Sequence, residues 1–578
     1  MKKLVDECWL LSSLLFLLIL QSCNDKNKVP SEAAINAINL KTGDIVYCGP
    51  PGKQFGAVAF ETSCSEKIKP DFDLAVSLLH SFEYDEAEKA FAKIIRTEPT
   101  CAMAYWGVAM SNYHQLWPSA PTPADLEKGN RAISLAQTLA KKPGREADYI
   151  DAIAVFYKDW NKIDHRTRAI AFEKAMERVY KKYPTDKEAA IFYALSLDGA
   201  ADPTDKSFSN QKKAGAILSR LYPNEPHHPG IVHYIIHSYD YPELAAMALP
   251  AARKYAAIAP SSAHAQHMPS HIFTRLGLWN ECIQSNLVSA ASAKCYGETS
   301  NFKGHWDEEL HAMDYLVYAY LQKGDNALAK QQLDYLRTIH EVYPPNFKVA
   351  YAFAAIPSRY FLENHMWQEA TEIELLPATF PWQKFPWQKA IVHFARLIGN
   401  VHTKNIKAAN AELQNLQNSY QALLTQKDAY KANQVQIQIK TGQAWIQLAE
   451  GNTDAALQLM KTAADMEDKT EKSPVTPGEI LPAKELLGDM LLQLNKPVEA
   501  LAAYEGNLIK HPNRFNGLYG AALASERANN LVKANYYYMQ LTAVTNATDS
   551  KRPELEIARA FLKKEAKGAK QKNDQAFH

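Results

Sequence analysis

Apolar residues recur along this chain at intervals of three and four positions, the spacing that gathers them on one face of an α-helix. Between Arg145 and Pro184, such positions are held by Tyr149, Ile153 and Phe156 among others. No run of note shows the apolar–polar alternation that a half-buried β-strand would produce. The pattern therefore predicts an all-α protein.

The helical pattern also repeats along the chain. Ala500 and Tyr504 are followed 34 residues later by Ala534 and Tyr538. Thirty-four residues is the length of the tetratricopeptide repeat, a helix–turn–helix unit that stacks on its neighbours. We therefore predict a tetratricopeptide-type helix–turn–helix solenoid of about eight to ten helical pairs.

Breaks in the repeat divide the chain into segments. The stretch Phe380–Lys389, FPWQKFPWQK, interrupts the pattern and is typical of a junction between two solenoid segments. The predicted segments are a signal peptide at 1–22, a lipid-anchored tether and irregular lead-in at 23–69, an N-terminal solenoid at 70–379, a junction with middle repeats at 380–470, C-terminal repeats at 471–565 and a disordered tail at 566–578.

The N-terminus has the features of an export signal. Lys2 and Lys3 precede an apolar run, Trp9–Leu20, that is short for a membrane span. Its ending, Leu20–Cys23, resembles a bacterial lipobox, in which the cysteine becomes the lipid-modified first residue of the mature protein. The resemblance implies lipidation at Cys23 and a place in the bacterial cell envelope, in the periplasm or at the outer membrane, with membrane contact through the lipid only.

Charge and cysteine content narrow the partners and the compartment. The formal net charge is +1 and 22% of residues are charged, which does not favour a nucleic-acid or anionic-membrane partner. An oxidising envelope permits a disulfide between Cys48 and Cys64, or one between Cys282 and Cys295.

Histidine is concentrated in one stretch, where seven of the chain's 18 histidines fall between His227 and Arg275. His233 and His237 are four residues apart, and so are His267 and His271. This spacing places both imidazoles of a pair on one helix face. Because the two pairs are themselves 34 residues apart, we expect them side by side on neighbouring helices.

The blocks HPGIVHYIIHSYD and HAQHMPSHIFTRLG resemble the signatures of a widespread group of bacterial tetratricopeptide proteins whose biochemical role is unsettled. In the tetratricopeptide family the first helix of each unit lines a concave groove where ligands bind. The resemblance directs a set of polar residues into that groove: His228, His233, His237, Asp240, His264, His267, His271, Arg275, His311 and Asp314. Asp314 stands where the group has a further histidine.

Clustered imidazoles with a nearby carboxylate are a usual environment for Zn, Cu, Fe or Ni. The predicted metal ligands are His228, His233, His237, His264, His267, His271, His311 and Asp314. Asp240 is a candidate partner for a ligating imidazole, and the only obvious acid or base for catalysis. The alternative is that these histidines cap helices or pack beside aromatic residues.

Two arginines are candidates for contact with a ligand. Arg275 fits a clamp for a carboxylate or phosphate in the same groove. Arg359 lies six residues before His365. If His365 takes the place of the glycine between the two helices of a repeat, the family's pattern turns Arg359 into the groove. An exposed arginine is the plainer interpretation.

Three functions of different class are compatible with these features. The first is a lipid-anchored binding protein whose groove holds a transition metal and a protein, peptide or small anionic ligand. The second is a metal-dependent hydrolase or oxidoreductase, although no HExxH, GxSxG, Walker-type loop, GxGxxG or CxxC motif is present. The third is a metal-free scaffold for protein–protein interaction.

Overall fold

The computed structural model describes residues 29–49, 54–114, 116, 121–202, 204–546 and 550–576. In this part of the chain all regular structure is helical, except for a parallel pair of two-residue strands, β1 (His305–Trp306) and β2 (Val342–Tyr343). None of the described helices is long and apolar enough to cross a bilayer. The predicted signal peptide and Cys23 lie outside the described residues.

The chain divides into two compact units, which we call unit 1 and unit 2. Unit 1 consists of the described residues within Met1–Ile45 and Phe55–Ser238, and unit 2 of those within Val46–Gln54 and Tyr239–His578. The division falls inside the segment predicted as one N-terminal solenoid, 70–379. The predicted junction at Phe380–Lys389 forms a single 3-10 turn, η3 (Trp382–Lys384), and the start of a helix within unit 2.

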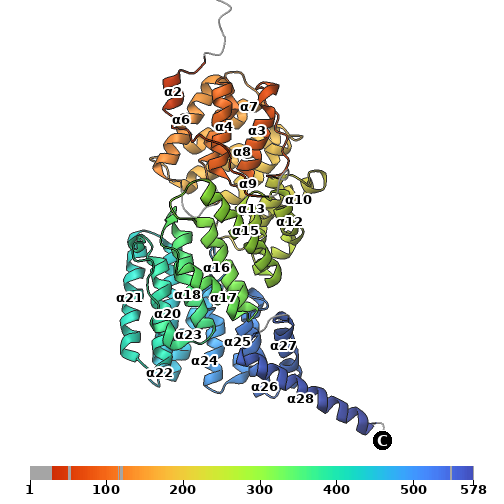
Figure 1. The fold of residues 1–578 in the computed structure, drawn as a ribbon, viewed down its shortest axis with the longest axis vertical. Coiled ribbons are helices and arrows are strands. Elements are labelled where there is room, and N and C mark those ends of the chain that lie inside the picture. The colour runs from red at the N-terminus through yellow and green to blue at the C-terminus, as the bar shows by residue number, and fades with distance from the viewer. Residues whose placement is uncertain are drawn as a thin grey trace, which may run out of the picture. The chain divides into compact units, whose positions relative to one another are not determined.

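Unit 1 is built from helices that pack on their neighbours in sequence, from α3 against α4 through to α9 against α10. These helices run from red to yellow in Figure 1. Their bounds are α2 (Glu32–Asn36), η1 (Glu66–Ile68), α3 (Lys69–His80), α4 (Tyr84–Thr97), α5 (Ala102–Ser111), α6 (Pro123–Leu139), α7 (Arg145–Tyr157), α8 (His165–Lys182), α9 (Lys187–Gly199), α10 (Ser209–Leu221), η2 (Tyr222–Asn224) and α11 (Pro229–Tyr239), the last residue of which belongs to unit 2.

Unit 2 is likewise built from helices that pack on their neighbours in sequence (Figure 1). Its helices are α12 (Ala245–Ile258), α13 (Ala263–His267), α14 (Pro269–Arg275), α15 (Trp279–Thr299), α16 (Asp307–Gln322), α17 (Asn326–Leu336), α18 (Phe347–Glu363), α19 (Trp367–Thr371), α20 (Pro386–His402), α21 (Ile406–Thr425), α22 (Ala429–Ala449), α23 (Thr453–Asp468), α24 (Ala483–Gln493), α25 (Pro497–Lys510), α26 (Phe515–Arg527), α27 (Leu531–Val544) and α28 (Pro553–Ala576). The prediction of an all-α, tetratricopeptide-type helical solenoid is confirmed, and α28 extends through most of the predicted tail.

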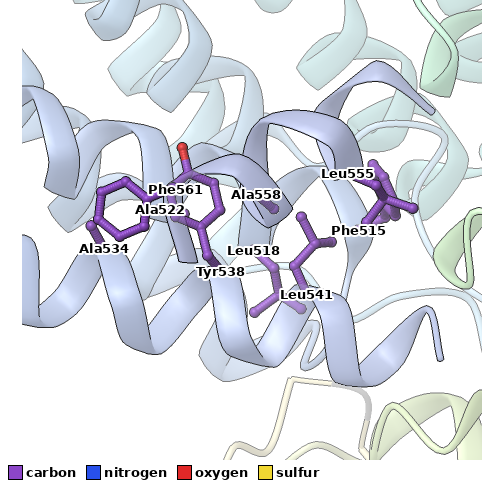
Figure 2. Close-up of a cluster of buried hydrophobic side chains, with 9 residues drawn as sticks. All are labelled: Phe515, Leu518, Ala522, Ala534, Tyr538, Leu541, Leu555, Ala558 and Phe561. Carbon is purple, nitrogen blue, oxygen red and sulfur yellow. The ribbon is translucent and has the colours of Figure 1, made fainter. Parts of the chain in front are cut away.

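The C-terminal repeats show why the small and aromatic positions recur. The ring of Tyr504 on α25 is fully buried, and a Cβ added at Gly488 or Gly520 would lie 2.6 or 2.3 Å from it. Glycine at these two positions therefore lets α24 and α26 approach the tyrosine. One repeat later Tyr538 is buried in a cluster shown in Figure 2, whose members are Phe515, Leu518, Ala522, Ala534, Tyr538, Leu541, Leu555, Ala558 and Phe561.

The disulfide pairing differs from the prediction. Cys48 bonds to Cys295 and Cys64 bonds to Cys101, while Cys282 is free and buried. The predicted pairs, Cys48 with Cys64 and Cys282 with Cys295, are wrong. The reason is topological, because the chain passes between units in this lead-in and leaves Cys48 in unit 2 but Cys64 in unit 1.

Candidate metal centre

Three imidazoles converge in unit 2, from His267 on α13, His271 on α14 and His311 on α16. One ligand nitrogen from each lies within 4.8 Å of the others. The three side chains are buried, with 0, 4 and 6% of their surfaces exposed. The labels of α13, α15 and α16 in Figure 1 locate this region. We call these three residues the tri-His cluster.

A proline divides the helix that carries the predicted His267–His271 pair. Pro269 has no backbone N–H, and the inner helix is split at Met268 into α13 and α14. The two histidines therefore lie on consecutive short helices rather than on one. They still face each other across the break.

The tautomer of His267 is fixed by Asn286 on α15. The Asn286 amide donates through Nδ2 to the carbonyl of Cys282 at 2.8 Å, which turns its Oδ1 toward His267 Nδ1 at 2.7 Å. An amide oxygen only accepts hydrogen bonds, so Nδ1 of His267 is the donor. In the neutral ring, Nε2 then carries a lone pair.

Asp240 orients His271 in the same way. Its Oδ2 lies 3.1 Å from His271 Nδ1. Burial alone would raise the pKa of Asp240, but Lys472 and Arg275 outweigh it and lower the pKa well below its usual range. The ionised carboxylate accepts the proton of Nδ1, and Nε2 of this ring also carries a lone pair.

These two lone pairs meet, because Nε2 of His267 and Nε2 of His271 are 3.1 Å apart. Burial, and after it the neighbouring His271, lowers the pKa of His267 well below its usual range. Burial likewise lowers the pKa of His271, although Asp240 opposes the change. Two neutral rings in these tautomers repel each other unless a cation lies between them.

The donor set fits a transition-metal ion. Two imidazole nitrogens on one tetrahedral Zn²⁺, at about 2.0–2.1 Å each, would be about 3.3 Å apart. The ring of His311 lies 4.3 Å from that of His267, centroid to centroid, and burial lowers the pKa of His311 well below its usual range. Three imidazoles would leave a further coordination position, and the Tyr315 hydroxyl lies 3.4 Å from His271 Nε2.

A segment between α23 and α24, Thr470–Pro482, lies over the cluster, and we call it the cover segment. The Tyr315 hydroxyl donates to the carbonyl of Val475 at 3.2 Å. Lys472 Nζ lies 3.7 Å from the Asp240 carboxylate. The predicted histidine-lined groove is therefore filled at this point by the chain itself.

Arg275 has a different role from the predicted clamp. Its guanidinium donates through Nε to Asp240 Oδ1 at 2.9 Å and through Nη2 to the Asp240 carbonyl at 2.8 Å. Only 9% of the residue is exposed. Its charge is already neutralised by the carboxylate that orients His271.

Asp314 and Arg359 pair with each other. Arg359 is fully buried and bonds to the Asp314 carboxylate through Nη1. Its Nη2 donates to the carbonyl of Gly478 in the cover segment at 2.6 Å. The prediction of an exposed Arg359 is wrong. Asp314 pairs with this arginine and is not part of the tri-His cluster.

The predicted pair on α11, which lies in unit 1, repeats the geometry of the His267–His271 pair. His233 Nδ1 donates to the carbonyl of His80 at 2.7 Å, since a carbonyl only accepts. Its Nε2 lies 3.1 Å from Nε2 of His237. His233 is fully buried and His237 is half-buried.

The other predicted ligands are placed as follows. His264 is buried on α13, three residues before His267. His228 lies just before α11, where its Nε2 is 2.9 Å from the carboxylate of Glu188. His228 therefore contacts Glu188 and belongs neither to the His233–His237 pair nor to the His267–His271 pair.

Sequence reasoning missed Asn286 and Tyr315. Tyr315 follows His311 by four residues on α16 and so shares its helix face, a signal that could have been used. Asn286 comes from the next helix, and the sequence carries no signal that it contacts His267.

Comparison with known proteins identifies no family for this chain. No family model matches the chain, and no curated protein matches it. Among solved structures, the human IFIT1 dimer with PPP-AAAA is 12% identical, with 82% of this chain and 89% of that chain covered and a TM-score of 0.35. The APC/C hetero-tetramer Cut9–Hcn1 is also 12% identical, covering 86% and 89% with a TM-score of 0.31. The P58(IPK) TPR domain is 13% identical, covering 65% and 99% with a TM-score of 0.20.

Proposed function

We propose that the protein is a cell-envelope tetratricopeptide-type binding protein that holds a transition-metal ion at the tri-His cluster. The observation that carries this proposal is the approach of His267 Nε2 to His271 Nε2, at 3.1 Å, while both rings already use Nδ1 as a donor. A bound cation would convert this repulsion into ligation. Imidazole donors suit Zn, Cu, Fe or Ni.

The surroundings of the cluster supply what a resident ion needs. Asn286 and Asp240 hold the two rings in the tautomer that presents Nε2, the usual task of partners behind ligating imidazoles. The cover segment lies over one side of the cluster. His233 and His237 offer a second pair of donors with the same geometry, and His264 remains a further candidate.

The repeat scaffold would also bind a protein or peptide partner. Repeats of this type bind partners along the surfaces that stacked helices create. Attachment through a lipid on Cys23 would place the scaffold at a bacterial membrane. Arg275 would not clamp a small anionic ligand, because its guanidinium is paired with Asp240.

A second candidate function is a metal-dependent enzyme. Three protein ligands with an open position are typical of catalytic rather than structural zinc sites, which are closed by four. In such an enzyme a bound ion would act as a Lewis acid. Tyr315, 3.4 Å from His271 Nε2, is the residue best placed to hold or move a proton there.

Elemental analysis tests the proposal. The chain beginning after Cys23 would be prepared without a histidine tag and equilibrated with Zn²⁺. We expect bound metal in the wild type and in His393→Ala, whose imidazole pairs with Glu412 elsewhere in unit 2, and a loss of metal in the His267→Ala/His271→Ala double variant. Equal metal content in a folded double variant would overturn the tri-His cluster as a metal site. No metal in either protein would leave a metal-free protein–protein scaffold as the better account. If the protein turns over a hydrolase or oxidase substrate, and this turnover requires the metal, the enzyme would be the better account.

A further inference from the structure

A second group of buried ligating side chains lies in unit 1, apart from the tri-His cluster. It consists of His80 at the end of α3, Glu188 in the first turn of α9 and His228 just before α11. One ligand atom from each lies within 4.8 Å of the others, and their exposed fractions are 0, 4 and 4%. The chain thus brings three residues that are far apart in sequence to one point.

The two oxygens of Glu188 are divided between the two rings. Oε2 lies 2.9 Å from His80 Nε2, and Oε1 lies 2.9 Å from His228 Nε2. The two imidazole rings meet edge to face, with centroids 4.9 Å apart. Both nitrogens therefore point at a single carboxylate from different sides.

The negative charge of Glu188 is not balanced by a lysine or arginine. In the part of the chain that the structure describes, the hydrogen bonds and ion pairs of the Glu188 carboxylate are those to the two imidazoles. Glu188 contributes to the raised pKa of Arg145, but the Arg145 guanidinium pairs with Asp186, at 2.6 Å. A buried carboxylate requires a cation or several donors, and here it has two ring nitrogens.

The two rings differ in how their second nitrogens are satisfied. His80 Nδ1 lies 2.9 Å from the Tyr234 hydroxyl, and its ring stacks on Phe192 with centroids 4.8 Å apart. His228 Nδ1 is buried and has no hydrogen-bond partner among the described residues. The only hydrogen-bonding contact of the His228 ring among the described residues is therefore that of Nε2 with Glu188.

The packing around His80 also reserves space for its imidazole. A Cβ added at Gly230, on the first turn of α11, would lie 2.6 Å from His80 Nδ1. Only a glycine lets α11 approach the ring so closely. The position of His80 is thus set by the contact between α3 and α11 before any ligand binds.

We propose that His80, Glu188 and His228 form a second metal site, which takes a divalent first-row transition ion such as Zn²⁺ or Fe²⁺. Two imidazoles and one carboxylate form a donor set that proteins use for both ions, and it leaves coordination positions open. An ion bound by these three residues would balance the negative charge of Glu188. This set is chemically distinct from the three imidazoles of the tri-His cluster, so the two sites would differ in affinity and metal preference.

The test compares metal content in variants of each site. Glu188→Gln keeps the shape of the side chain but removes its charge. The matched control is Asp198→Asn, a buried acid on the same helix α9 that bonds to Ser238. After equilibration of the full chain with Zn²⁺, we expect Glu188→Gln to lose about one ion per chain relative to the wild type and Asp198→Asn to lose none.

The two proposals fail separately in this design. Metal content unchanged in folded Glu188→Gln, with metal lost in His267→Ala/His271→Ala, would overturn the second site and keep the tri-His centre. The reverse result would overturn the tri-His centre and keep the second site. If Glu188→Gln does not fold, anomalous diffraction from wild-type crystals grown with Zn²⁺ decides: a peak between Glu188 and the two imidazoles supports the site, and its absence overturns it.

Discussion

His267 and His271 face each other through Nε2 atoms 3.1 Å apart, and each ring is held in that orientation by a different acceptor behind it. The acceptor behind His267 is an amide whose own orientation is fixed by a backbone carbonyl. This chain of contacts makes the geometry of the cluster depend on a residue that would never touch the ion.

Asn286 is therefore predicted to control metal affinity. Asn286→Ala removes the acceptor for His267 Nδ1 and should weaken metal binding about 10- to 100-fold, as the loss of an orienting partner usually does. Asn286→Asp retains an acceptor and should restore most of the affinity. Competition titration against a chelator measures both. Ser289→Ala is the control, because this buried hydroxyl on the same helix bonds to the Ala263 carbonyl instead. Equal affinity in Asn286→Ala and the wild type would contradict the assignment.

Helix contact in the C-terminal repeats is predicted to depend on Gly520. An alanine there would place its Cβ 2.3 Å from the Tyr504 ring, and overpacking of this kind costs about 1–3 kcal/mol of unfolding free energy. Gly506→Ala on α25 is the control, since its Cβ would meet only the flexible end of Lys484, at 3.2 Å. That variant should be neutral or more stable, by up to about 1 kcal/mol, because alanine favours helix. Urea denaturation followed by circular dichroism would measure both, and similar midpoints would argue against the close packing.

Asp489 is predicted to make stability fall as pH rises. Burial raises its pKa to about 7, against the hydrogen bond from Tyr504, while Glu485 adds to the increase. The unfolded chain releases this proton near pH 4 and the folded chain near pH 7, so the folded state loses stability across that interval.

Asp489→Asn should remove this loss, because an amide can still accept from Tyr504. The variant should be more stable than the wild type at pH 8, by up to about 4 kcal/mol, and equally stable near pH 4. Urea midpoints at the two pH values provide the measurement. A stabilisation that is the same at both would show that Asp489 does not titrate in this range.

The disulfide pattern predicts a specific set of cross-linked peptides. Protein isolated from an oxidising compartment should yield peptides linking Cys48 to Cys295 and Cys64 to Cys101, with Cys282 alkylated only after unfolding. Mass spectrometry without reduction would detect them. The double variant Cys64→Ser/Cys101→Ser should lose about 2–4 kcal/mol of stability, since the bond restrains the unfolded chain. A peptide linking Cys48 to Cys64 would refute this pairing.

The sequence predicts the helices well because their signals are local. The 34-residue shift that relates Tyr504 to Tyr538 is confirmed by the burial of both rings, and the small residues around them leave the space that these rings fill. The Cys48 and Cys64 pairing was wrong because sequence proximity says nothing about the unit to which each residue belongs. Periodicity contains no such information.

In the candidate site, too, the features set by local spacing could be predicted from the sequence, and those set by tertiary contacts could not. The facing of His267 and His271 follows from their spacing, and it survives the break at Pro269. The partners of Arg275 and Arg359 do not follow from spacing, because they depend on which helices and loops come together. The clearest example is Gly478, more than 100 residues after Arg359 in the chain, whose carbonyl accepts from that arginine.

The cover segment is predicted to control access to the tri-His cluster. Its residues Lys472–Glu479 contact Asp240, Tyr315 and Arg359 and are mostly buried. Replacing these eight residues by a glycine–serine stretch of equal length removes the Lys472 ion pair and loosens the carbonyls of Val475 and Gly478. Chelator should then remove bound metal several-fold faster, because covering segments limit the entry of solvent and reagents.

The matched control replaces another eight-residue irregular stretch of unit 2, Glu372–Thr379, in the same way. It should change stability without changing the rate of metal loss, since it does not contact the cluster. Stopped-flow mixing with a chromogenic chelator measures both rates. If the two replacements accelerate metal loss equally, general loosening of unit 2 explains the effect and the cover segment has no gating role. If only the first does, the segment that fills the predicted groove is the barrier between the ion and solvent.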